Sequence, residues 1–229
     1  MLPDIHTHRY SPNPYAVYSI RLVSDLPDTP EDYFFPHPVP LFSVGIHPWD
    51  FTIKLSTQLS EKEIRFLQHP RCVAIGECGL DTIRGNFQEQ EVGLHFYFRL
   101  AQEQQKPLII HLVKAWQHWF RLRSEAPADV KCLIHGFKGS SELANRILDS
   151  GDWISFGSYW IRQPGLLNLI SQLKVPNWLL ETDNDPHPEI LSNLWGQLND
   201  ISDTPKSLES DEKLKTRFKQ FLNLGNLDE

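Results

Sequence analysis

The feature that most constrains the fold is a regular alternation of short apolar runs with helical patterns. The runs are apolar at consecutive positions, as strands buried on both faces are. Eight candidate strands occupy residues 2–6, 16–23, 41–46, 73–77, 107–111, 131–135, 153–156 and 178–181. Helical patterns occupy residues 60–68, 88–105, 117–124, 140–150 and 164–173. From the third strand onward the order alternates strictly, which predicts a parallel sheet with right-handed crossovers.

The number of strands indicates one fold class. Eight strands in 229 residues match an α/β chain folded as a (β/α)8 TIM barrel, near the small end of that fold's range. Residues 9–40 are too few and too rich in proline for two full crossover helices, so we expect a trimmed barrel wall near the N-terminus. We expect residues 1–229 to form a single hydrolase domain, with further helices at 190–198 and 214–222. An open doubly wound sheet is the alternative architecture.

Composition excludes several classes of protein. Apolar residues make up 40% and charged residues 22%, which is ordinary for a globular chain. No apolar run is long enough to span a membrane, and the first residues lack the pattern of a secretory signal. Three cysteines without a CxxC motif predict no disulfide framework and fit a cytoplasmic location. The net charge of −7 argues against nucleic-acid binding through bulk electrostatics.

The informative ionisable residues fall where the predicted strands end. They are His6, His8, Glu77, His111, His135 and Asp183. In a barrel, the carboxyl ends of the strands converge on one rim, where the active sites of this fold lie. His6 and His8 are two residues apart, so on a strand their side chains point to the same face. Imidazole with carboxylate suits Zn²⁺, Mn²⁺ or Fe²⁺, and carboxylate-rich sets also bind Mg²⁺.

The size of this set favours two metal ions over one. Four histidines and two carboxylates exceed the three protein ligands of a usual mononuclear catalytic zinc site, and they fit two ions that share a carboxylate. A single HxH pair is weak evidence for a metal site on its own, and a lone histidine at a strand end is more often structural. The remaining histidines, in loops and helical patterns, have that structural interpretation: His37, His69, His95, His118 and His187. His47 is intermediate, because it closes a strand within a His-Pro pair.

Six ordered motifs resemble those of the TatD-related metal-dependent deoxyribonucleases, which belong to the amidohydrolase-like TIM barrels. The motifs are DIHTH (4–8), VGIHP (44–48), AIGECGLD (74–81), PLIIH (107–111), HGFKG (135–139) and LETD (180–183). The resemblance implies that His6 and His8 bind one metal with Asp183, and that His111 and His135 bind a second. It also implies that Glu77 bridges the two, with Mg, Mn or Zn as the divalent ions.

The resemblance further implies a TatD-like deoxyribonuclease that cleaves phosphodiester bonds with a metal-activated water, with Asp183 and Glu77 as catalytic residues. The substrate is then DNA or a small phosphoester, and no membrane is involved. Candidate substrate-binding residues are Lys114, Lys138 and His47, and candidate aromatic or cationic rim residues are Trp49, Trp116, Tyr159, Trp160 and Arg162. An amidohydrolase-type enzyme acting on a small amide, ester or phosphate is the alternative. A barrel that keeps its ligands only as a binding site is a third hypothesis.

Overall fold

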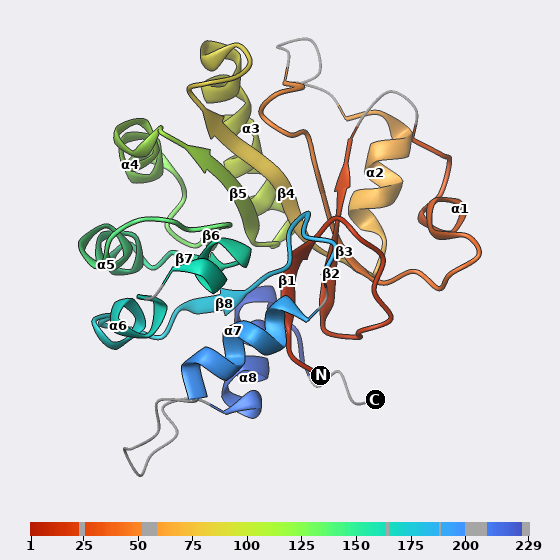
Figure 1. The fold of residues 1–229 in the computed structure, drawn as a ribbon. Coiled ribbons are helices and arrows are strands. Elements are labelled where there is room, and N and C mark those ends of the chain that lie inside the picture. Colours follow the sequence, from red (N-terminus) through yellow and green to blue (C-terminus); the bar gives the residue numbers. More distant parts are fainter. Residues whose placement is uncertain (23–25, 52–58, 164, 188, 200–209, 226–229) are drawn as a thin grey trace. The chain divides into compact units, whose positions relative to one another are not determined.

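The computed structural model contains one eight-stranded sheet whose strands follow the order of the sequence, from β1 to β8 (Figure 1). It describes the chain except residues 23–25, 52–58, 164, 188, 200–209 and 226–229. The strands are β1 (Asp4–Thr7), β2 (Ala16–Arg21), β3 (Leu41–Gly45), β4 (Cys72–Asp81), β5 (Leu108–Val113), β6 (Cys132–Ile134), β7 (Trp153–Phe156) and β8 (Trp178–Leu180). A doubly wound sheet reverses its strand order at a switch point, and this sheet does not. The topology is that of the expected (β/α)8 barrel.

Helices follow most of the strands at the predicted places. They are α1 (Pro30–Phe34), α2 (Glu61–Gln68), α3 (Phe87–Gln104), α4 (Trp116–Glu125), α5 (Ser141–Asp149), the 3-10 helix η1 (Ser158–Arg162), α6 (Leu166–Ser171), α7 (Ile190–Asn199) and α8 (Asp211–Leu222). Local signals explain the boundaries. Ser60 and Glu63 form a capping box at the start of α2. Gly151 follows α5 with φ +80°, as a residue just past a helix end does.

The trimmed wall near the N-terminus is confirmed. Residues 8–15, between β1 and β2, contain no helix, and α1 is the only helix that the described residues form between β2 and β3. The three cysteines are free and buried. No helix in the described part of the chain is long and apolar enough to cross a membrane.

The chain divides into two compact units. The continuous unit comprises Tyr18–Cys132, and the split unit comprises Met1–Val17 together with Leu133–Glu229. The single hydrolase domain over residues 1–229 stays a prediction.

In the continuous unit, β3, β4 and β5 pair in parallel. Helix α3 runs along β4 and contributes the buried residues Tyr97 and Phe98 to the core beneath the sheet (Figure 1). Strand β4 is longer than predicted, and its ten residues are all buried. Because it continues to Asp81, Glu77 lies inside the strand rather than at its end. His111 likewise lies inside β5, which continues to Val113.

Two glycines allow β4 to approach β5 closely. Gly76 and Gly79 have φ of +132° and +142°, and a Cβ atom on either would lie within 2.3 Å of a β5 carbonyl oxygen. On Gly79 that Cβ would lie 2.0 Å from the carbonyl oxygen of His111. Only glycine avoids both the clash and the backbone strain here. The glycines on either side of Glu77 are therefore required by the pairing of β4 with β5.

Replacing Gly79 by alanine is expected to lower the free energy of unfolding by more than about 4 kcal/mol, or to prevent folding. The matched control is Gly151→Ala, where an added Cβ meets nothing within 4 Å and only the positive φ opposes it. Gly151→Ala is expected to lower the free energy of unfolding by about 1–2 kcal/mol. Urea unfolding followed by circular dichroism measures both, and similar midpoints for the two variants would contradict the close-approach explanation.

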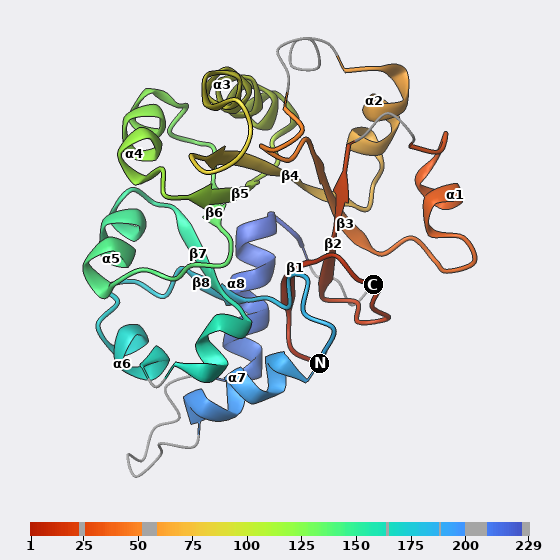
Figure 2. The same cartoon turned by 45° about the horizontal axis from the view of Figure 1, so that its top comes forward.

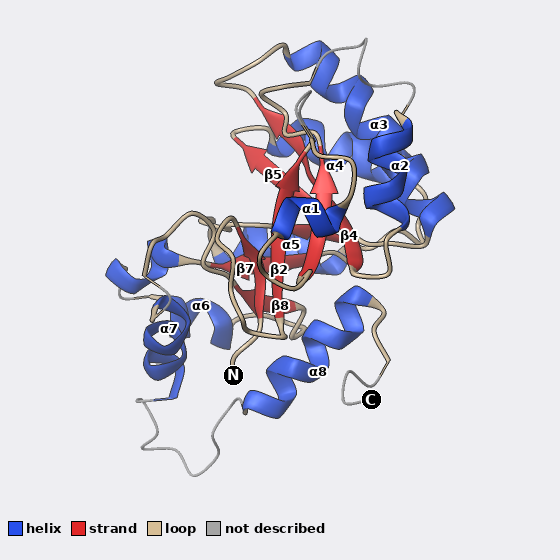
Figure 3. Ribbon diagram, turned by 90° about the vertical axis from the view of Figure 1, so that its right-hand side faces the viewer, coloured by secondary structure: helices blue, strands red, loops and turns tan. Residues whose placement is uncertain are grey.

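In the split unit, β6, β7 and β8 pair in parallel, and Thr7 at the end of β1 forms a parallel bridge with Asp183 just after β8. Helix α8 lies alongside β8 (Figures 2 and 3). The Phe221 ring packs at 5.5 Å from that of Trp153, the first residue of β7. The α8 helix thus covers the amino end of this strand, which leaves the carboxyl ends available for a site.

Candidate metal centre

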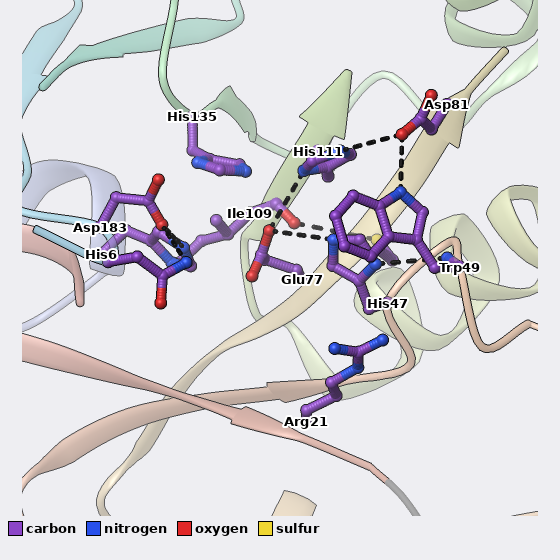
Figure 4. Close-up of polar contacts among 12 residues, drawn as sticks. His6, Arg21, His47, Trp49, Glu77, Asp81, Ile109, His111, His135 and Asp183 are labelled. Atoms are coloured by element: carbon purple, nitrogen blue, oxygen red, sulfur yellow. Dashed lines mark hydrogen bonds and ion pairs between the residues drawn. The ribbon is translucent and has the colours of Figure 1, made fainter. Parts of the chain in front are cut away.

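The split unit brings His6, His8 and Asp183 together at the carboxyl end of β1. The Nε2 atoms of both imidazoles lie near the same carboxylate oxygen, Asp183 Oδ1, at 3.7 Å for His6 and 3.6 Å for His8. Figure 4 shows His6 beside Asp183. His6 is fully buried, and the Asp183 side chain is 41% exposed. The two imidazoles therefore lie on the same side, as the two-residue spacing predicted, and both face one carboxylate.

The backbone holds Asp183 in a strained conformation. Its φ is +52°, in the left-handed region that residues other than glycine rarely adopt. Its N–H donates to the carbonyl oxygen of His6 at 2.9 Å, and its own carbonyl accepts from the N–H of His8 at 3.1 Å. These two hydrogen bonds fix the strained residue beside β1. Strain that the surrounding structure enforces in this way is concentrated at functional sites.

Asp4 anchors the segment that carries Asp183. Its carboxylate accepts the backbone N–H of Thr182 at 3.0 Å and the Thr182 hydroxyl at 2.7 Å. Burial raises the pKa of Asp4 to about 7, against the lowering effect of the hydrogen bonds from Thr182. The sequence prediction missed this role, although Asp4 and His6 alternate along β1 and so share a face.

A second group in the split unit contains His135 and Glu181. His135 Nδ1 lies 3.6 Å from Glu181 Oε1, and the His6 and His135 rings are 4.5 Å apart. Ser155 donates its hydroxyl to Glu181 at 2.5 Å. Burial raises the pKa of Glu181, but its hydrogen bond to His135 and the nearby imidazole charges outweigh burial and lower it overall. His135, Glu181 and Asp183 place ligand atoms within 4.8 Å of one another. Glu181 is therefore a candidate ligand, which the sequence prediction omitted.

The continuous unit assembles Glu77 with two histidines. Glu77 Oε1 lies 3.3 Å from His111 Nδ1 and 3.6 Å from His47 Nε2 (Figure 4). Burial lowers the pKa of His47 to about 4 against the opposing charge of Glu77. The neutral imidazole is the form that binds a metal. The structure thus groups His47 with potential ligands, whereas the sequence suggested contact with substrate.

Asp81 and Trp49 lie behind His111. The Trp49 indole N–H donates to Asp81 Oδ2 at 2.6 Å, and that oxygen lies 3.8 Å from His111 Nε2 (Figure 4). Burial raises the pKa of Asp81, but hydrogen bonds led by that from Trp49 lower it overall. A carboxylate on the far nitrogen of a metal-binding imidazole fixes the orientation of the ring. Neither residue was predicted in this role.

The donor atoms fit a divalent metal in their chemistry and spacing. The nitrogen–oxygen distances among the potential ligands are 3.3–3.7 Å, longer than ordinary hydrogen bonds. Two ligands bound at about 2.1 Å in a tetrahedral site lie about 3.4 Å apart. Imidazole nitrogen and carboxylate oxygen are the donors that zinc, manganese and iron accept. Both units therefore present sets of side chains arranged as metal ligands.

The predicted substrate residues have different environments. Lys114 and Lys138 are exposed, and Lys138 Nζ lies 5.6 Å from the centre of the Tyr159 ring. Trp49 is 39% and Tyr159 41% exposed, so both offer ring surface to solvent. The prediction that Trp160 is a rim residue is wrong, because its ring is buried and its indole N–H donates to the Phe137 carbonyl at 2.7 Å. Of the other two rim candidates, Arg162 is exposed and Trp116 is half-buried.

Comparison with known proteins identifies the family. The family model described as TatD related DNase matches residues 37–213. The chain belongs to the TatD related DNase family. A relative from Klebsiella pneumoniae, named as the 3'-5' ssDNA/RNA exonuclease TatD, is 32% identical over 149 residues, covering 62% of this chain and 56% of that protein. The chain thus matches little more than half the length of this TatD relative.

A second relative and a solved structure are also similar to this chain. An uncharacterized metal-dependent hydrolase from Methanocaldococcus jannaschii is 26% identical, over 76% of this chain and 67% of its own length. The crystal structure of the TatD homolog YJJV from Escherichia coli has a TM-score of 0.64 at 21% identity, covering 92% of this chain and 86% of that one. The likeness in structure supports the TIM-barrel fold.

Proposed function

We propose that this TatD family member is a divalent-metal-dependent hydrolase that cleaves phosphodiester bonds in single-stranded nucleic acid. The observation that carries the proposal is the pair of imidazoles that face Asp183 Oδ1. The second set, around Glu77, supports it, as does the TatD relative named as a single-strand exonuclease.

The proposed ligands follow the family resemblance. By that resemblance His6, His8 and Asp183 would hold one ion, His111 and His135 would hold a second, and Glu77 would be a further ligand. His47 and Glu181 stand next to these ligands within their own units. When bound, the ions lower the pKa of an attacking water and neutralise charge on the phosphoryl oxygens.

The side chains then supply proton transfer and orientation. Asp183 combines a fixed backbone with a partly exposed carboxylate, so it accepts the proton of the attacking water as general base. Asp4 and Thr182 hold the segment that carries it. Asp81 orients the His111 ring, with Trp49 hydrogen-bonded behind it. The net charge of −7 does not oppose a phosphate substrate, because the bound cations concentrate positive charge at the site.

A time course of cleavage tests the proposal. The purified protein is incubated with single-stranded and duplex oligonucleotides in Mg²⁺, Mn²⁺ or Zn²⁺, beside small phosphoester and amide substrates. We expect metal-dependent cleavage of the single strand, faster than that of the duplex. Hydrolysis of the small amides or monoesters alone would replace the proposal with an amidohydrolase-type activity.

A further inference from the structure

Arg84, in the loop between β4 and α3, carries its positive charge over the face of an aromatic ring. Its side chain is exposed, and its guanidinium carbon lies 4.2 Å from the centre of the Trp49 ring. Among the residues that the structure describes, no carboxylate forms an ion pair with it. Arg21, at 6.0 Å from the same ring, differs because Asp50 neutralises it.

Buried hydrogen bonds fix the loop that carries Arg84. The Gln90 side chain, 1% exposed, accepts the Asp81 N–H at 2.7 Å and donates to the Arg84 carbonyl at 2.6 Å. The Asp81 carboxylate accepts the Ile83 N–H at 2.8 Å. One buried side chain thus bridges both ends of the turn. A solvated arginine does not need such a scaffold, whereas a binding residue gains affinity from a position fixed in advance.

Trp49 links Arg84 to the candidate ligands of the continuous unit. The Trp49 ring lies 4.6 Å from the His47 ring and 5.9 Å from the His111 ring, between centroids. Its N–H is committed to Asp81, so the orientation of the indole is fixed. The Trp49 ring therefore contacts both the Arg84 guanidinium and the imidazoles that face Glu77.

From this arrangement we propose that Arg84 binds a phosphate group of the substrate, which rests on the phosphodiesterase function proposed above. A planar guanidinium forms two parallel hydrogen bonds to phosphate oxygens, and stacking on Trp49 restricts its motion before the substrate arrives. Lysine in this place keeps the charge but loses the paired geometry and the stacking. Neither Arg84 nor its stacking on Trp49 was predicted from the sequence.

The test compares Arg84→Gln with Arg99→Gln, whose arginine is exposed on α3 of the same unit. Steady-state cleavage of a single-stranded oligonucleotide gives kcat and KM for each variant. A charge-assisted hydrogen bond contributes about 1.5–3 kcal/mol, so we expect the KM of Arg84→Gln to rise about ten- to a hundredfold. The KM of Arg84→Lys should lie between those of Arg84→Gln and wild type. Arg99→Gln should match wild type, and metal content should be equal in all four proteins.

A titration with inorganic phosphate separates this inference from the function on which it rests. Calorimetry of the Mg²⁺-loaded proteins should show at least about tenfold weaker phosphate binding in Arg84→Gln than in Arg99→Gln. Wild-type protein that cleaves no oligonucleotide would contradict the proposed function, and the titration would still decide whether Arg84 binds phosphate. Active wild type with equal KM and equal phosphate affinity in the two glutamine variants would overturn the role of Arg84.

Discussion

Asp183→Asn is expected to reduce phosphodiester hydrolysis by at least about a thousandfold while the chain stays folded. The side chain faces two imidazoles through one oxygen, and its backbone is fixed on β1 by two hydrogen bonds. Asparagine preserves the shape and the backbone contacts. It removes the negative charge that binds a cation and the basic oxygen that accepts a proton.

Initial rates on a single-stranded oligonucleotide measure this effect, and thermal unfolding verifies the fold. The matched control is Asp185→Asn, two residues further along the same segment. The Asp185 carboxylate accepts the backbone N–H of His187 at 3.1 Å, a bond that an amide oxygen also accepts. We therefore expect the control to remain close to wild type. Equal rates for the two variants would remove Asp183 from the mechanism.

The barrel order was predictable because strands buried on both faces leave continuous apolar runs. The ends of the longer strands were not predictable in the same way. Strand β4 continues through Gly79 to Asp81, where its glycines pair closely with β5. Glycine usually signals the end of a strand, so the sequence suggested a shorter one. The position of Glu77 within its strand depends on this tertiary contact.

The candidate site was also only partly predictable. Histidines near predicted strand ends stand out in the sequence. The carboxylates that orient them do not, because an Asp or Glu can equally have a structural role. Asp4 was missed because its role depends on hydrogen bonds to Thr182, 178 positions away in the sequence. Asp81, at the end of β4, was missed because its partner Trp49 lies 32 positions away in the sequence. Contacts between segments remote in sequence have no local pattern that reveals them.

Removing the metal is expected to abolish hydrolysis and to lower the melting temperature. A ligand present at a thousand times its dissociation constant stabilises the native state by about 4 kcal/mol for each site. For a chain of this size that corresponds to roughly 8–16 °C. Glu77 and Glu181 are buried beside imidazoles, so removal of a cation also leaves buried negative charge less well compensated.

Differential scanning fluorimetry with and without a chelator measures the shift, and elemental analysis counts the ions, of which we expect close to two per chain. Glu77→Gln should show a smaller shift than wild type, whereas His118→Ala, on the exposed face of α4, should show the full shift. Restoring Mg²⁺, Mn²⁺ or Zn²⁺ should recover stability and hydrolysis together. Recovery of stability with every metal, but of hydrolysis with none, would favour a barrel that uses its ligands only for binding. An unchanged melting temperature and rate after chelation would contradict the metal centre itself.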